Sequence, residues 1–168
     1  MRSVLIGIIA FAAAATTARA DEEATLAKGR PTDKGTLGVG IILGEPTGIC
    51  AKLYLEDDEA IQVAVGSAFV DGGLQIDADY VFHPWILQDR DTFVLPVYVG
   101  PGVRFVQYND KPSYFAAGAR GVIGMLFDFK SVPLDAFIEV AGVLQWRFAD
   151  GKGAGIGLNA GAGVRYYF

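Results

Sequence analysis

The chain has 168 residues, which is enough for one domain with or without a tail. It carries 14 Lys and Arg against 19 Asp and Glu, and this acidic balance argues against nucleic-acid binding, which requires a basic surface. Hydrophobic residues make up 52%, too many for a disordered chain and many for a soluble domain of this size. One cysteine excludes an internal disulfide framework, and one histidine excludes a multi-histidine metal site.

The first twenty residues have the three parts of a secretory signal peptide. Arg2 gives a positive start, an apolar run covers 4–15, and Ala18-Arg19-Ala20 places small residues before a cut. The run is too short for a transmembrane helix, which needs about 20 apolar residues. We expect cleavage after Ala20, followed by a flexible periplasmic segment at 21–35. No later stretch is long and apolar enough for a membrane-spanning helix.

From Thr36 onward, apolar residues alternate with polar or small ones, as in strands that face two environments. The alternation is clearest in 154–168, where the even positions are apolar and the odd positions are mostly glycine. Turn-like connections separate the segments, the longest being 84–91 and 107–114, so no crossover helix fits and a parallel sheet is excluded. We predict an all-β fold of eight antiparallel up-and-down strands over 37–44, 49–55, 61–66, 73–83, 92–106, 115–128, 133–148 and 154–168.

Such a meander can close into a barrel and so remove its free edges. The apolar face holds roughly forty residues, more than the interior of an eight-stranded barrel can contain, while the other face is rich in glycine. We therefore expect the apolar face to point outward to lipid, which makes 36–168 a transmembrane β-barrel. Aromatic residues near the segment ends fit interfacial girdles, although aromatic residues favour strands in general.

The last strand ends in Phe168, with Tyr166 and Val164 at the alternate positions before it. It resembles the terminal strand that the barrel-assembly machinery of Gram-negative bacteria recognises. Residues 36–168 resemble the small outer-membrane barrels of the OmpA transmembrane-domain and OmpX type. The pieces GEPTG, LPVYVGPGVRF and GAGVRYYF are also similar to other bacterial outer-membrane barrel families. The resemblance implies an outer-membrane location, with lipid and the assembly machinery as partners, and no particular substrate.

With the apolar face outward, ionisable residues point into the lumen. Buried charges must be paired, because an isolated one costs several kcal/mol. Asp128, Asp135 and Arg147 lie nearer the strand ends. The mid-strand members, which we expect to form a network of salt bridges, are Lys52, Asp77, Asp79, Arg104, Arg120, Glu139 and Arg165.

Other polar residues carry weaker signals. We interpret His83 as a solvated residue at the barrel rim, since no serine is placed to pair with it as a nucleophile. The run from Glu56 to Glu59 is read as an acidic turn rather than a cation site, because it lacks the spacing of a calcium loop. Cys50 is expected to be a small buried residue.

The expected function is that of a monomeric structural protein of the outer membrane, with no enzymatic activity, cofactor or metal. Both chain ends would face the periplasm, and the short hairpins near 45, 71, 110 and 151 would face outside. One alternative is a narrow pore for water, ions or a small solute. Another is a soluble, lipocalin-like periplasmic barrel that binds an apolar ligand, which would require polar residues on the outer face.

Overall fold

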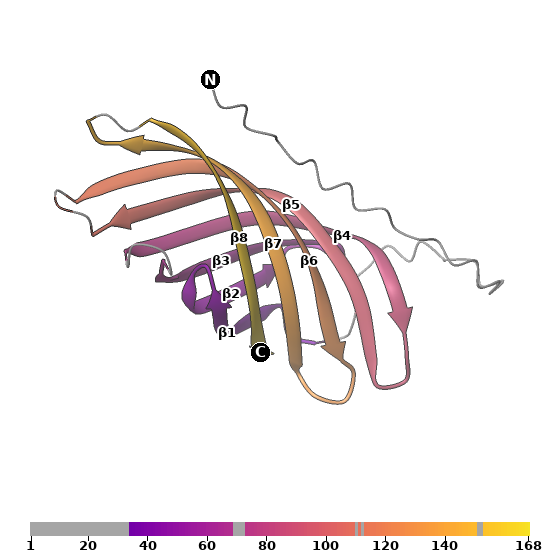
Figure 1. Ribbon diagram of the computed structural model, residues 1–168. Coiled ribbons are helices and arrows are strands. Elements are labelled where there is room, and N and C mark those ends of the chain that lie inside the picture. Colours follow the sequence, from indigo (N-terminus) through magenta and orange to yellow (C-terminus); the bar gives the residue numbers. More distant parts are fainter. Residues whose placement is uncertain (1–33, 69–72, 110, 112, 151–152) are drawn as a thin grey trace, which may run out of the picture.

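The computed structural model describes residues 34–68, 73–109, 111, 113–150 and 153–168. The predicted signal peptide 1–20 and residues 21–33 lie outside these ranges. Each strand is antiparallel to its neighbours in the chain, and β1 pairs with β8 to close the ring (Figure 1). The predicted antiparallel meander is therefore confirmed, with strands β1 (Leu37–Gly44), β2 (Thr47–Tyr54), β3 (Glu59–Ser67), β4 (Leu74–Asp89), β5 (Phe93–Tyr108), β6 (Tyr114–Phe129), β7 (Leu134–Phe148) and β8 (Ala154–Tyr167).

The expected connection at 84–91 is wrong, because β4 continues to Asp89. The register between β4 and β5 shifts between Phe82 and Trp85, and the odd spacing of these two residues still leaves both exposed. An irregularity of this kind breaks the two-residue alternation that marks a strand in the sequence. The connection expected at 107–114 is likewise shorter, since β5 ends at Tyr108 and β6 begins at Tyr114.

The register fixes the stagger of the barrel. One circuit of paired residues starts at Gly38 and passes Lys52, Gln62, Asp79, Gly102, Arg120, Val143 and Gly157. On the last pair of strands, Gly44 pairs with Gly161, and the circuit ends at Gly157, four residues before Gly161. Since Gly44 is six residues beyond Gly38, the circuit returns to the line of β1 ten residues from its start. For eight strands, this stagger corresponds to a strand tilt of about 40° from the barrel axis.

The two ends of the barrel differ. We call the end that holds Leu37 and Tyr167 the terminal end, and the opposite end, with the connections after Gly44, Ser67, Tyr108 and Phe148, the hairpin end. Strands β1 to β3 have only 8, 8 and 9 residues, whereas β4 to β8 have 14 to 16. The wall is therefore about 20 Å high on one side and about 35 Å high on the other.

Side chains follow the predicted alternation around the ring. Along β7, for example, Ile138, Val140 and Leu144 are exposed, whereas Asp135 and Phe137 are buried. Small residues leave room inside for large ones: a Cβ built on Gly124 would lie 2.2 Å from the ring of Tyr98. Glycine on the inner face thus lets side chains from neighbouring strands cross the narrow lumen.

Candidate functional site

The middle of the lumen is organised around Arg120 on β6. Its guanidinium forms ion pairs with Asp77, with Asp79 at 2.9 Å and with Glu139 at 3.2 Å. We call these four residues, three acids around one arginine, the Arg120 cluster. Taken alone, the cluster carries one positive and three negative formal charges, which is an excess of acid.

Neutral side chains extend the Arg120 cluster. Gln62 donates hydrogen bonds to Asp79 and Glu139, each at 3.1 Å, and the hydroxyl of Tyr98 donates to Glu139 at 2.6 Å. These hydrogen bonds to the carboxylates reduce the free-energy cost of burying more acids than bases.

Toward the hairpin end, Arg104 on β5 joins the network. It donates to Glu45 at 2.8 Å, to Gln75 at 2.9 Å and to Asn159 at 3.0 Å. Gln75 in turn donates to Asp77 at 2.8 Å, so hydrogen bonds and ion pairs run without a break from Arg104 to the Arg120 cluster.

Toward the terminal end, Arg165 on β8 holds Asp135 on β7. Its Nε and Nη2 atoms each lie 3.1 Å from an oxygen of Asp135, and the hydroxyl of Tyr167 donates to the same carboxylate at 2.6 Å. The guanidinium also lies 4.1 Å from the ring centroid of Phe137, a cation–π contact. Asp128, which like Asp135 was predicted to point inward near a strand end, forms an ion pair with Lys34.

Lys52 does not join a carboxylate pair among the described residues. Its Nζ lies 2.7 Å from Nε2 of His83, and the rings of Tyr98 and Tyr54 lie 4.6 and 5.2 Å from it. The solvated position predicted for His83 is wrong, because its exposed fraction is only 1%. His83 lies on the same face of β4 as Asp77 and Asp79, so the alternation places its ring inside the barrel, where Nδ1 lies 3.1 Å from the carbonyl oxygen of Asp58.

The sequence therefore predicted which residues point into the lumen better than it predicted which of them pair with one another. All seven mid-strand residues point into the lumen, but only Arg120, Asp77, Asp79 and Glu139 pair with one another. Arg104 and Arg165 pair with Glu45 and Asp135 instead. Alternation already placed Asp135 inside, whereas it makes no statement about Glu45, which lies in the turn after β1.

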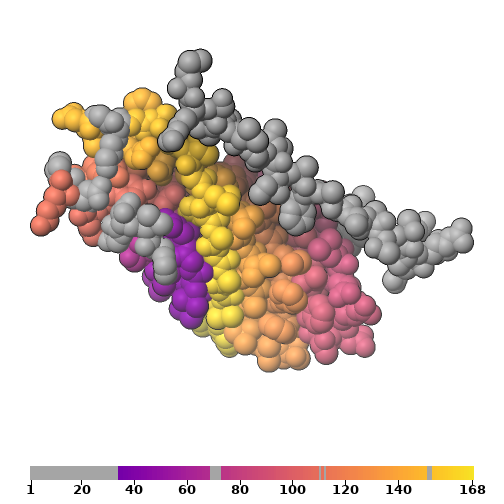
Figure 2. Space-filling view, viewed as in Figure 1, coloured from indigo at the N-terminus to yellow at the C-terminus, as the bar shows by residue number. Residues whose placement is uncertain are grey.

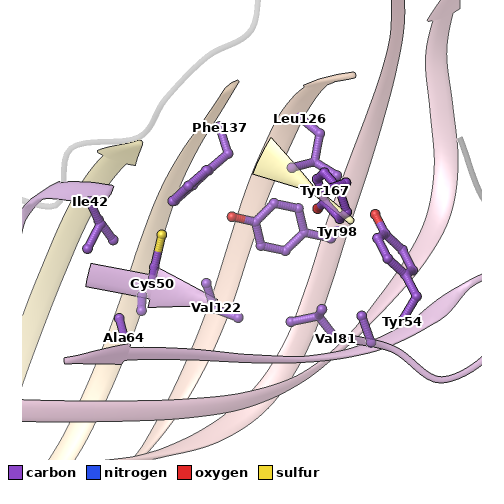
Figure 3. Close-up of a cluster of buried hydrophobic side chains, with 12 residues drawn as sticks. Ile42, Cys50, Tyr54, Ala64, Val81, Tyr98, Val122, Leu126, Phe137 and Tyr167 are labelled. Atoms are coloured by element: carbon purple, nitrogen blue, oxygen red, sulfur yellow. The ribbon is translucent and has the colours of Figure 1, made fainter. Parts of the chain in front are cut away.

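Apolar and aromatic side chains fill much of the remaining lumen. Figure 3 shows Tyr54, Tyr98 and Tyr167 grouped with Val81 and Leu126 inside the ring, with Ile42, Cys50 and Phe137 beside them. Cys50 is buried, as predicted. The space bounded by Gln62, Asp77, Arg120, Phe137 and Glu139 is a cavity of about 10 Å³, room for about one water molecule.

The outer surface is apolar along every strand. Among the described residues, thirty-two large hydrophobic side chains are exposed, from Leu37 on β1 to Phe168 at the chain end. Figure 2 shows one such face, where β1, β8 and β7 lie side by side. A shallow apolar groove crosses this face between Leu43 and Phe127, with Ala136 and Ala162 in its lining.

Exposed aromatic residues lie in two belts. The terminal-end belt contains Phe82, Trp85, Phe127, Phe129, Tyr166 and Phe168. The hairpin-end belt contains Phe105, Phe115, Trp146 and Phe148. Phe115 and Phe127 lie on the same strand, twelve residues apart, which corresponds to about 30 Å along the axis of a barrel tilted by 40°.

The predicted assembly-signal residues lie on the outer face of the last strand and at the chain end. Val164, Tyr166 and Phe168 are all exposed, and the rings of Tyr166 and Phe168 lie 5.0 Å apart. The backbone amide of Phe168 donates to the carbonyl of Leu37 at 3.0 Å, so these residues also help close the ring.

The acidic turn between β2 and β3 gathers carboxylates without further metal ligands among the described residues. One oxygen from each of Glu56, Asp58 and Glu59 lies within 4.8 Å of the others. Glu59 also accepts a hydrogen bond from the hydroxyl of Tyr80. The predicted reading as an acidic turn is compatible with this arrangement.

Comparisons with known proteins give no relative: no protein-family model, curated protein or solved structure matches this chain. Among the described residues there is no helix long and apolar enough to cross a membrane.

Proposed function

We propose that this chain is an integral β-barrel of the bacterial outer membrane whose role is structural. The observation that carries the proposal is the inverted distribution of polarity. Large apolar side chains cover the outside, and Lys52, Asp77, Arg104, Arg120 and Arg165 are buried inside. A soluble barrel has the opposite distribution, whereas a barrel in lipid has an apolar outer band and a polar interior.

The aromatic belts support the same placement. Tyr and Trp favour the interface between hydrocarbon and headgroups. The separation of about 30 Å between the belts on β6 equals the thickness of a typical hydrocarbon core. Closure of the ring also pairs most of the backbone groups within the wall, as a lipid environment requires.

The filled lumen favours a scaffold over a pore. The Arg120 cluster, Gln62 and Phe137 border a cavity of about 10 Å³, and the buried tyrosines Tyr54, Tyr98 and Tyr167 occupy further space inside the ring. The role of soluble apolar-ligand binder has less support, because the apolar face points away from the lumen. His83 is engaged with Lys52 and with the Asp58 carbonyl, so the proposal gives it a structural role and includes no catalysis.

The proposed partners are outer-membrane lipid and, during biogenesis, the barrel-assembly machinery, and the proposed state is a monomer. The exposed residues Val164, Tyr166 and Phe168 would be the contact for that machinery, as the resemblance of the last strand implies. Export would depend on the signal peptide predicted for residues 1–20.

Membrane fractionation combined with a heat-modifiability gel tests this proposal. We expect the protein in the outer-membrane fraction and a shift in migration between unboiled and boiled samples, because a closed, hydrogen-bonded sheet resists unfolding by detergent. Recovery as soluble periplasmic protein would contradict the membrane placement and would favour the ligand-binding alternative.

A further inference from the structure

The barrel wall has a gap beside the first half of β8. The ladder between β1 and β8 runs from Gly38 and Tyr167 to Gly44 and Gly161 and stops there. Beyond it, the backbone hydrogen bond from the described part of β1 and its turn to β8 is that of the Glu45 amide, which donates to the carbonyl of Ala160 at 2.9 Å. The stretch from Ala154 to Asn159 pairs with β7 but has no ladder to β1.

Strand geometry shows which backbone groups this gap exposes. The carbonyl of Ala160 faces β1, while that of Gly153 accepts from Arg147 on β7. Because successive residues of a strand direct their backbone groups to opposite sides, Ala154, Ile156 and Leu158 direct theirs toward the gap. The side chains of Ile156 and Leu158 are 90% and 78% exposed, the highest values among the large apolar residues described.

Two arginines lie on the inner wall directly behind this edge. A Cβ built on Gly155 would lie 2.8 Å from Nη2 of Arg147, and one on Gly157 would lie 3.9 Å from Nη1 of Arg104. These glycines are two residues apart on one strand, about 7 Å. Arg104 has Glu45 as its partner, whereas Arg147 forms no ion pair with any described residue. Arg147 is therefore the arginine of this pair that has no acidic partner among the described residues.

Unpartnered buried atoms identify the chemistry that is missing. Around Gly155 and Gly157 these atoms are three donors, Nε of Arg104, Nε of Arg147 and Nδ2 of Asn159, and one acceptor, Oε1 of Gln145. Asn159 and Arg104 are each only 4% exposed. Buried donors of this kind are costly unless an acceptor reaches them. A site rich in donors and in positive charge fits an anion such as a phosphate or carboxylate.

We propose that this site binds the anionic head group of a membrane amphiphile, which enters through the gap between β8 and the β1–β2 turn. The site consists of Arg147, Arg104, Asn159 and the free edge of Ala154–Leu158. The head group would accept hydrogen bonds from these donors, and its acyl chain would lie outside along Ile156 and Leu158. The inference rests on the proposed membrane location, since only there does an acyl chain border the gap.

Trp146 reports on this site, because it pairs with Ala154 and its ring faces outward. In a Trp85→Phe background it is the one tryptophan, since the sequence has two. The full chain is placed in phosphatidylcholine vesicles, and quenching of Trp146 is compared between brominated phosphatidic acid and brominated phosphatidylcholine. Charge-assisted hydrogen bonds predict a preference of roughly tenfold or more for phosphatidic acid.

Arg147→Gln is expected to remove this preference, and Arg90→Gln is the matched control. Arg90 carries the same charge and is exposed in the connection between β4 and β5, at the opposite end of the barrel. A heat-modifiability gel on each variant establishes that the barrel has formed. Equal loss of preference in both variants would overturn the site, because it would show a general charge effect.

The remaining outcomes separate the two proposals. Equal quenching by both lipids would overturn the anion site alone. No quenching by either lipid would overturn the membrane placement and the site with it. Loss of the preference when inorganic phosphate is added at the lipid concentration would overturn the lipid as the source and assign the site to the free anion.

Discussion

Arg120 neutralises more buried charge than any other side chain described in the lumen. Its guanidinium is paired with Asp77, Asp79 and Glu139, all within the barrel. Removing one partner of a buried ion pair leaves the other charges uncompensated, which costs more than the pair contributes relative to an apolar filling. Removal of Arg120 therefore lowers stability mainly because three buried acids would lose their positive partner.

We expect Arg120→Ala to lower the free energy of unfolding by about 3–5 kcal/mol, the cost of breaking a buried ion pair. The measurement is urea unfolding of the barrel in lipid vesicles. Lys130→Ala is the control, because its ion pair with Asp89 is exposed and such pairs contribute about 0–1 kcal/mol. Similar losses in the two variants would contradict the buried network.

A second prediction concerns the Cβ atom that a substitution of Gly124 would add. A Cβ there would lie 2.2 Å from the Tyr98 ring, so Gly124→Ala displaces the ring that donates to Glu139. We expect a loss of about 1–3 kcal/mol, the usual cost of overpacking, in the same unfolding assay. Gly121→Ala is the matched control on the same strand, because nothing lies within 4 Å of its Cβ position. A loss in the control as large as in Gly124→Ala would refute the packing argument.

The strands differ in how far the sequence predicts them. The number and direction of all eight followed from alternation and turn residues, because side chains on opposite faces of a strand meet opposite environments. The end of β4 could not be predicted in this way, because the register shift after Phe82 interrupts the alternation. The shortness of β1 to β3 was visible in the sequence, but the gap beside β8 depends on the register, which only the folded ring fixes.

The last strand makes a prediction about assembly. Phe168 follows the last residue of the ladder between β1 and β8. It is 72% exposed, and its ring contacts the ring of Tyr166 in an edge-to-face arrangement. If the assembly machinery recognises it, Phe168→Ala should lower the amount of barrel in the outer membrane severalfold. Phe148→Ala is the control, since Phe148 is an outward aromatic at the other end with 61% exposure. Equal amounts of both variants in the membrane would show that Phe168 is not an assembly signal.

The barrel taken as a unit has a charged, filled interior inside an apolar wall. The sequence predicted which face is charged, because glycine and long ionisable residues share alternate positions. It did not predict the large apolar residues inside, such as Leu126 and Phe137, because the apolar outer face dominates the pattern. His83 shares the inner face of β4 with Asp77 and Asp79, so its side of the strand follows from the alternation, whereas its expected solvated position at the rim was wrong.

This filling predicts that the barrel does not conduct. We expect no current steps above background when the purified protein is inserted into planar lipid bilayers, because the Arg120 cluster and the Tyr98 ring occupy the lumen. Insertion is verified on the same sample by the heat-dependent gel shift. Regular single-channel steps from the unaltered protein would favour the pore alternative over the scaffold.

The most direct test of the central claim is a nitroxide scan along β7 in lipid vesicles. Single cysteines replace residues 138–145 in a Cys50→Ala background and are spin-labelled, and collision with oxygen, which concentrates in hydrocarbon, is measured at each site. We expect high oxygen accessibility at Ile138, Val140 and Leu144 and low accessibility at the intervening inward positions. Uniform values, or outward labels that collide mainly with a water-soluble reagent, would contradict the placement of the apolar face in lipid.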